Sequence, residues 1–100
     1  MVKKASKASR NHAESVAIAA LTFIASDPER LGRFLASTGI GPADIRIAAR
    51  EPLFLAGVIG HITADQELLL IFAAEIGLSP PDIDRARQTL GGPDWERDVP

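Results

Sequence analysis

Few side chains in this chain of 100 residues could carry out chemistry. The absence of cysteine excludes disulfides, iron–sulfur clusters, thiolate zinc sites and cysteine nucleophiles. The two histidines, His12 and His61, have no partners at a spacing typical of a metal site or a catalytic triad. The sequence also lacks a nucleophile elbow, a phosphate-binding loop and a dinucleotide-binding fingerprint. We therefore predict that the protein is not an enzyme and that it binds neither a cofactor nor a metal.

Two acidic pairs with the same spacing are the remaining candidates for catalysis, Asp27 with Glu29 and Asp65 with Glu67. Two carboxylates could perform general acid–base chemistry. Each Asp, however, precedes an apolar helical pattern, where it is a preferred N-cap, and each Glu falls in the first turn, at the positive end of the helix dipole. We therefore predict that Asp27 and Asp65 are structural helix caps. His61 lies in an apolar stretch, where we expect a packed or half-exposed side chain rather than a catalytic one.

The segment GIGP at residues 39–42 resembles the hairpin of a helix-hairpin-helix DNA-binding motif. In such a hairpin, glycines let backbone N–H groups approach a phosphate closely. The match is incomplete, because Ile45 stands where a small residue is usual and Asp44 places an acid near the turn. The alternative is a plain glycine C-cap at Gly39, followed by a helix that begins at Pro42.

Positive charge is concentrated at the N-terminus. The first ten residues carry a charge of +4 with no acid, whereas the remaining ninety carry −6. We expect residues 1–11 to form a solvated basic arm, which could contact nucleic acid weakly, in a salt-sensitive way, or lie against its own acidic domain. The residues that would contact nucleic acid are Lys3, Lys4, Lys7 and Arg10 of the arm and Gly39, Ile40 and Gly41 of the hairpin.

The chain contains an internal repeat with an offset of 38 residues. When residues 22–50 are aligned with residues 60–88, 11 of the 29 pairs are identical, where average amino-acid usage would give about two. We predict two three-helix repeats, about 16–50 and 54–88, that pack around a pseudo-twofold axis. The matched positions that we expect to cap helices are Asp27 and Asp65 at the N-termini and Gly39 and Gly77 at the C-termini.

All of the predicted secondary structure is helical, because no stretch alternates with the period of a strand. Apolar residues recur at helical spacings instead, as in Leu68 and Phe72. The predicted fold class is all-α, a compact bundle of about six short helices that forms a single domain over residues 12–91. The polar tail, residues 92–100, contains Trp95, which either docks on the domain or anchors a partner. The expected helices are 12–25, 28–38, 42–50, 52–63, 66–76 and 80–90.

The apolar segment at residues 16–25, which follows the basic arm, has the outline of a signal peptide. Cleavage there would remove a core helix of the first repeat, so we favour a helix of the mature domain. Segments 53–62 and 68–74 are too short to cross a bilayer, and we predict a cytoplasmic protein with no membrane contact. Gly57 and Gly60 create a small-residue face that would accept either a helix of the other repeat or another subunit.

The C-terminal half, residues 65–92, resembles a family of small alphaproteobacterial proteins known only as a domain of unknown function. The resemblance rests on ELLLIFA at residues 67–73 and GLxP at residues 77–80. It extends through residues 54–56 into the first repeat. The family implies a cytoplasmic helical domain with no assigned activity and no catalytic residues to carry over.

Two functions remain open at this point. The first is a non-enzymatic protein-interaction domain that binds itself or another protein through an apolar or acidic face. The second is a weak nucleic-acid-binding protein that uses the hairpin and the basic arm. The acidic body favours the first, unless four arginines gather on one face: Arg30, Arg33, Arg46 and Arg50.

Overall fold

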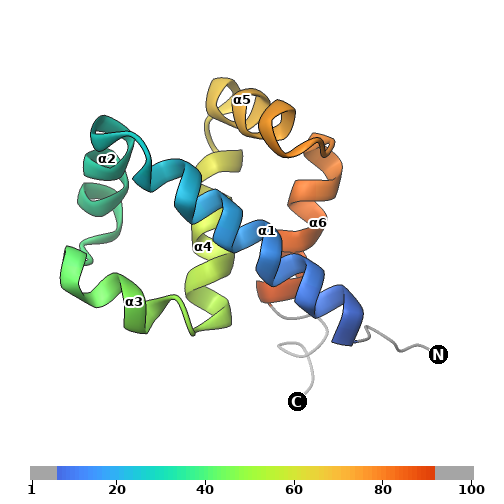
Figure 1. The fold of residues 1–100 in the computed structure, drawn as a ribbon, viewed down its shortest axis with the longest axis horizontal. Helices are drawn as coiled ribbons and strands as arrows, with labels where there is room; N and C mark the ends of the chain where they lie inside the picture. Colours follow the sequence, from blue (N-terminus) through green and yellow to red (C-terminus); the bar gives the residue numbers. More distant parts are fainter. Residues whose placement is uncertain (1–6, 92–100) are drawn as a thin grey trace, which may run out of the picture.

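Six α-helices and one short 3₁₀ turn make up residues 7–91, the part of the chain that the computed structural model describes (Figure 1). Side chains are described from residue 10 to residue 91. Within these residues there is no strand, so the all-helical prediction with six helices is confirmed. The elements are α1 (Lys7–Ala25), α2 (Pro28–Thr38), the 3₁₀ turn η1 (Pro42–Asp44), α3 (Ile45–Ala48), α4 (Pro52–Thr63), α5 (Gln66–Ile76) and α6 (Pro80–Gly91).

The core lies where α1, α4 and α6 pack against one another. In Figure 1, α1 runs diagonally across α4, with α2 and α3 on one side and α5 and α6 on the other. Phe34 of α2 and Phe72 of α5 are both completely buried. The central helices bury residues at spacings of three and four, which marks the inward face of each helix: Val16, Ala17, Ala20, Phe23 and Ile24 in α1; Leu55, Val58, Ile59 and Ile62 in α4; and Ile83, Ala86 and Leu90 in α6.

Local signals explain where most of the helices begin and end. The chain leaves α2 at Gly39 (φ 76°) and α5 at Gly77 (φ 72°), both in the left-handed conformation that glycine adopts without steric cost. The hydroxyl of Ser79 accepts a hydrogen bond from the N–H of Asp82 at 3.3 Å and donates to its carboxylate at 2.8 Å. This reciprocal arrangement caps the N-terminus of α6.

Two of the predicted helices differ from the structure by more than one residue. Helix α1 begins at Lys7 rather than at residue 12, so residues 7–11 are helical instead of part of an arm. Lysine, alanine and arginine are good helix formers, so the helix continues toward the N-terminus past Asn11, the N-cap type that precedes the predicted start. The predicted helix 42–50 is divided into the 3₁₀ turn and the single turn of α3, which ends at Ala48. The proline at position 52 disfavours helical backbone at residue 51, which is extended (φ −92°, ψ 121°) and separates α3 from α4.

The small-residue face of α4 packs against α6. A Cβ atom added at Gly60 would lie 3.7 Å from Cδ of Arg87, and one added at Gly91 would lie 3.9 Å from Cβ of Ala56. The neighbour at Gly60 is therefore α6, which belongs to the same predicted repeat as α4, and not a helix of the other repeat as the sequence argument offered. Gly57, in contrast, is exposed and has nothing within 4 Å of its Cβ position.

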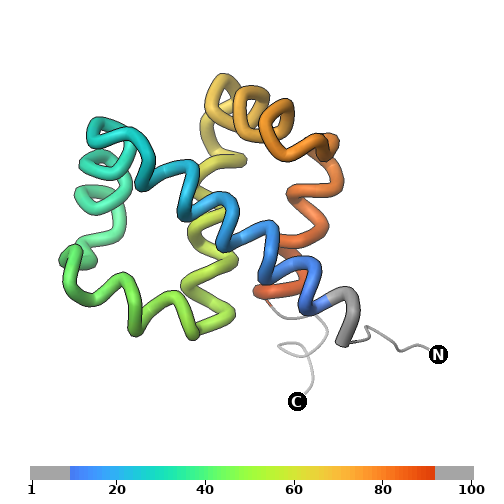
Figure 2. The backbone as a smooth tube through the Cα atoms, viewed as in Figure 1, coloured from blue at the N-terminus to red at the C-terminus, as the bar shows by residue number. Residues whose placement is uncertain are grey.

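The two halves of the described chain agree in their second helices and differ in their third. Helices α2 and α5 have the same length of 11 residues and the same types of cap. Ile83 of α6 is completely buried, whereas Ile45, the matching residue of α3, is only half-buried. No residue of η1 or α3 is fully buried. Of these two third helices, only α6 therefore packs in the core against α1 and α4 (Figure 2).

Candidate functional site

The N-terminal turns of α2 and α5 bring the two acidic pairs to one end of the molecule. Asp27 accepts a hydrogen bond from the N–H of Glu29 at 3.0 Å, and Asp65 accepts one from the N–H of Leu68 at 3.2 Å. Both aspartates have the extended backbone of an N-cap residue. The carboxylates therefore satisfy backbone donors that the helix itself leaves free.

In α2 these acids have cationic partners. Arg30 lies 3.8 Å from Asp27, and Arg33 lies 3.3 Å from Glu29. The guanidinium of Arg30 also stacks over the ring of Phe23, 4.1 Å from its centroid. The first turns of α2 thus have their charges balanced within the helix.

In α5 the two corresponding positions carry apolar residues. At the offset of 38 residues, Arg30 matches Leu68 and Arg33 matches Ile71. Among the described residues, neither Asp65 nor Glu67 forms an ion pair. The negative charge at the start of α5 is therefore left without a cation from its own helix.

A cleft of about 160 Å³ separates the two helix N-termini. Its walls combine the acids and arginines of α2 with the acids and two apolar side chains of α5. The residues that line it are Asp27, Glu29, Arg30, Arg33, Asp65, Glu67, Leu68 and Ile71. With four acids and two arginines, the cleft has an excess of negative charge.

The outer face of α5 is an exposed apolar stripe that continues from this cleft. Leu70 is 53% exposed and Ile71 is 45% exposed. Ala74, one turn further, is exposed as well. Residues three and four apart are neighbours on a helix, so Glu67, Ile71 and Glu75 form one row in which an acid stands on each side of the isoleucine. We call Leu70, Ile71 and Ala74 with these two acids the α5 face.

The sequence arguments missed the α5 face because α5 is apolar on nearly every side. Periodicity in such a helix does not reveal which side points outward. A signal was nevertheless present in the repeat. Gly32 and Arg33, two solvent-exposed positions of α2, correspond to Leu70 and Ile71 of α5.

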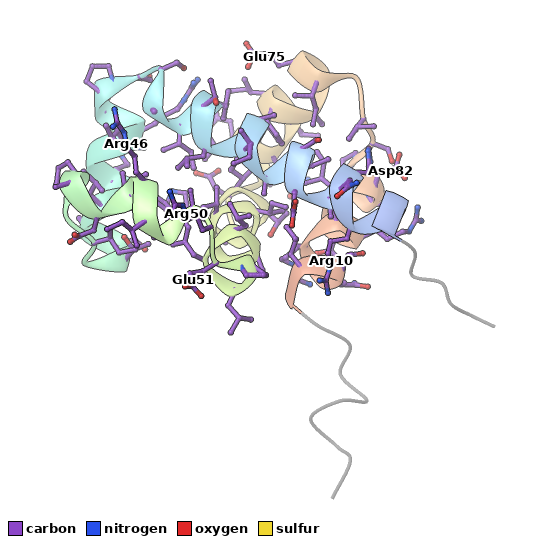
Figure 3. The ribbon with its side chains drawn as sticks, turned by 60° about the horizontal axis from the view of Figure 1, so that its bottom comes forward. Arg10, Arg46, Arg50, Glu51, Glu75 and Asp82 are labelled. Carbon is purple, nitrogen blue, oxygen red and sulfur yellow. The ribbon has the colours of Figure 1, made fainter. Side chains whose placement is uncertain are left out.

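Two other large apolar side chains are more exposed, but they belong to separate elements. Ile47 of α3 is 67% exposed, and Leu53 at the start of α4 is 71% exposed. In the sequence Ile47 follows Arg46 of α3, and Leu53 follows Arg50 of the turn after α3 by three residues; Figure 3 labels both arginines. Because α3 has a single turn, Ile47 and Leu53 form no stripe along one helix.

The hairpin at residues 39–42 uses part of its hydrogen-bonding capacity internally. The N–H of Ile40 donates to the hydroxyl of Thr38 at 3.3 Å, and the N–H of Asp44 donates to the carbonyl of Gly41 at 3.0 Å. A carboxylate oxygen of Asp44 lies 3.6 Å from the Cβ position of Gly41. This negative charge stands beside the glycines that would approach a phosphate, and it opposes phosphate binding there.

The cations that would support nucleic-acid binding do not all lie together in the described structure. Arg46 is on α3 and Arg50 is in the turn that follows it, whereas Arg10 lies near the start of α1, away from both in Figure 3. None of these three arginines forms an ion pair with a described residue. Lys7 begins α1. The predictions for Lys3, Lys4 and Trp95 concern residues outside the described part of the chain.

The side chains of the two histidines have different surroundings. The ring of His61 is half-buried and meets Phe34 edge-on, with 5.2 Å between centroids. His12 is exposed and lines a hollow of about 310 Å³ between α1 and α6, together with Asp82 and Arg85. Within residues 10–91, no group of three or more histidine, aspartate or glutamate side chains is arranged to hold a metal ion.

Two carboxyl groups of α6 have a lowered pKa. The hydroxyl of Ser79 donates to Asp82 and is the main reason why the pKa of Asp82 lies below its usual value of 3.8. The Nε–H of Arg87 donates to Asp84 at 2.8 Å and lowers the pKa of Asp84 in the same way. Both acids are held by neighbours on their own helix or cap, so these shifts serve the stability of α6.

The geometry of the described residues defines a small all-helical domain with an acidic cleft and one apolar stripe. The chain matches the family described as "Protein of unknown function (DUF3572)" over residues 10–93, and it belongs to that family. The uncharacterised domain family expected from the sequence is confirmed to that extent. No curated protein and no solved structure matches the chain.

The helices were also compared with the requirements of a membrane span. Within the described residues, no single helix is both long enough and apolar enough to cross a membrane. Helices α4 and α5 meet the criteria of length and composition only as a pair, and the pair is bent by 110°.

Proposed function

We propose that the protein is a non-enzymatic protein-interaction domain and that the α5 face is its binding surface. The observation that carries this proposal is the position of an almost wholly apolar helix at the edge of the bundle. A helix of this composition is usually covered on all sides. Here Leu70 and Ile71 remain about half exposed, so a partner would complete the burial that the domain leaves unfinished.

The pairing of α2 with α5 supports the same proposal. The two helices share their length and cap types, and α2 carries glycine and arginine where α5 exposes leucine and isoleucine. The helix framework therefore does not require apolar residues at positions 70 and 71. Exposed apolar residues without a structural role are typical of interaction sites.

The experiment is affinity capture from extracts of the source cells, followed by reconstitution with the purified captured protein. A double variant, Leu70→Ser with Ile71→Arg, removes the stripe. The control, Ile47→Arg with Leu53→Ser, removes two apolar side chains elsewhere that are more exposed than those of α5. We expect the α5 variant to raise the Kd of the reconstituted complex at least about tenfold, since each buried leucine or isoleucine contributes about 1.5–3 kcal/mol. Equal loss of binding in both variants, or no loss in the α5 variant, would contradict the proposal.

A second candidate function, weak nucleic-acid binding, is favoured by one observation. Arg46 on α3 and Arg50 just after it lie close in sequence to the hairpin of residues 39–42 and have no described ion-pair partner. The carboxylate of Asp44 argues against it. NMR amide spectra with short duplex DNA, at low and near-physiological salt, test this function. Salt-resistant shifts at residues 39–45 would support this function. Shifts confined to residues 3–10 that vanish with salt would show only charge attraction between the basic arm and the DNA.

Three further expectations accompany the main proposal. We propose a cytoplasmic location and an alphaproteobacterial origin, for which the support is the resemblance of residues 65–92. We also propose that the chain arose as two repeats with an offset of 38 residues. The support is the 11 identical pairs and the matching lengths of α2 and α5.

A further inference from the structure

The α5 face carries its own electrostatic selectivity. Glu67 and Glu75 each lie four residues from Ile71, one toward either end of the helix. Both glutamates are exposed, and neither forms an ion pair with a described residue. Figure 3 shows Glu75 projecting outward from α5. The apolar stripe is therefore bordered by negative charge at both ends.

Helix α2 shows what balances such acids in this fold. There Glu29 pairs with Arg33 at 3.3 Å, one turn along the same helix. At the matching positions of α5, Glu67 has Ile71 as its neighbour. The cation that α2 supplies from its own sequence is missing in α5, so Glu67 has no ion-pair partner on its own helix and is available to pair with a cation of a partner.

A second copy of this chain is a poor occupant of the α5 face. If two α5 helices packed in parallel, Glu67 would face Glu67 of the other copy. If they packed antiparallel around Ile71, Glu67 would face Glu75 of the other copy. Both arrangements bring like charges together while the apolar stripes meet, which is destabilising and disfavours that pairing.

We infer, on the basis of the proposed function, that the α5 face binds a basic amphipathic helix of another protein. The apolar residues of that helix would cover Leu70, Ile71 and Ala74. Glu67 and Glu75 are eight residues apart, which is about 12 Å along the helix axis. The partner would therefore carry lysine or arginine about two helical turns apart, flanking a leucine-like stripe of its own.

The salt dependence of binding follows from this chemistry. The acids are exposed, and charges in solvent are screened over about 8–10 Å at physiological salt. Each exposed ion pair contributes about 0.2–1 kcal/mol, so replacing both acids weakens binding about 2- to 30-fold. The apolar contacts are independent of salt and keep the complex at high ionic strength.

The test uses the full chain and two synthetic amphipathic peptides of equal length and equal apolar stripe. One peptide carries lysines two turns apart, and the matched control carries glutamates in their place. Amide NMR spectra are recorded during titration with each peptide. We expect shifts centred on residues 67–75 with the lysine peptide and binding at least about tenfold weaker with the glutamate peptide. The double variant Glu67→Gln with Glu75→Gln should weaken the lysine peptide 2- to 30-fold while leaving the fold intact.

Four results would overturn the inference. Equal binding of both peptides would show that the acids do not select the partner. Silence of residues 67–75 with the lysine peptide would show that the face does not take a basic helix. Shifts at these residues on raising the protein concentration alone would show that a second copy occupies the face. Broadening of the same residues by phosphatidylglycerol vesicles, without a response to the lysine peptide, would point to a membrane surface.

The failure of this inference can be distinguished from failure of the proposed function. If the α5 double variant at positions 70 and 71 abolishes binding of a captured partner that has no basic helix, the α5 face is the binding surface but does not select a basic helix. If that variant leaves the reconstituted complex unchanged, the interaction surface itself is wrong.

Discussion

Replacing glycine by alanine should have opposite effects at two positions of this chain. Gly57 lies in the interior of α4, is exposed, and has nothing within 4 Å of its Cβ position. An interior helical glycine costs about 0.5–1 kcal/mol relative to alanine, so Gly57→Ala should raise the free energy of unfolding by that amount. Gly77 has φ 72° and also has an empty Cβ position. Here the penalty comes only from the left-handed backbone, and Gly77→Ala should lower the free energy of unfolding by about 1–2 kcal/mol.

These free energies convert into measurable shifts in Tm. In a domain of this size, 1 kcal/mol corresponds to a Tm shift of about 4–8 °C. Gly57→Ala should therefore raise Tm by about 2–8 °C, and Gly77→Ala should lower it by about 4–16 °C. Thermal and urea unfolding, followed by far-UV circular dichroism on the full chain, measures both changes.

The matched control is Gly32→Ala in α2, which is also exposed and has an empty Cβ position. It should stabilise the domain by the same amount as Gly57→Ala. A gain at position 32 combined with a loss at position 57 would mean that another surface covers Gly57 in solution. Changes of the same sign at positions 57 and 77 would refute the reasoning from backbone conformation.

Three further predictions concern pH, the core and the caps. Asp84 has a lowered pKa in the folded state, chiefly through its hydrogen bond from Arg87, so its contribution to stability is present above the unfolded pKa near 3.8 and is lost as the pH falls through the lower folded value. The difference in unfolding free energy between wild type and Asp84→Asn should therefore be largest at neutral pH and shrink in acid. Urea titrations across pH measure it, and a difference that does not change with pH would contradict the prediction. Phe34→Ala empties a completely buried site and should cost about 3–5 kcal/mol, measured from the urea midpoint; a loss below 1 kcal/mol would mean that the site refills. Asp65→Ala removes the hydrogen bond to the first turn of α5 and should lower the free energy of unfolding by about 1 kcal/mol. Asp27→Ala also breaks an exposed ion pair and should cost the same or slightly more. An unchanged Tm in either variant would argue against the capping role.

The helix boundaries that could be predicted are the ones marked by local chemistry. Asp27, Gly39, Pro52 and Gly77 each impose a backbone conformation or satisfy a helix end without help from distant residues. The start of α1 has several such marks, because serine stands at positions 6 and 9 and asparagine at position 11, and the prediction placed the start five residues too late. Where candidate caps compete, the start of a helix depends on propensity and packing as well.

The packing of the third helices could not be predicted, because it depends on contacts between distant segments. Ile45 and Ile83 occupy the same place in the repeat, yet only Ile83 is completely buried. Helix α6 has twelve residues and packs close to Gly60 of α4, whereas α3 has four residues and no comparable contact. The α5 face was hidden for a related reason, since the direction of an apolar helix is set by its neighbours and not by its own pattern.

The packing of α6 against α1 and α4 has a consequence for the synthesis of the protein. The core needs the first and the last described helices together, and they are separated by the whole length of the domain. At about 5–20 residues per second, the ribosome completes residue 91 some 3–13 seconds after residue 25. During that interval the inward faces of α1 and α4 have no α6 to cover them. A chain that ends before α6 keeps those faces uncovered permanently, so premature termination should yield an aggregation-prone product and a substrate for chaperones and proteases rather than a smaller working domain.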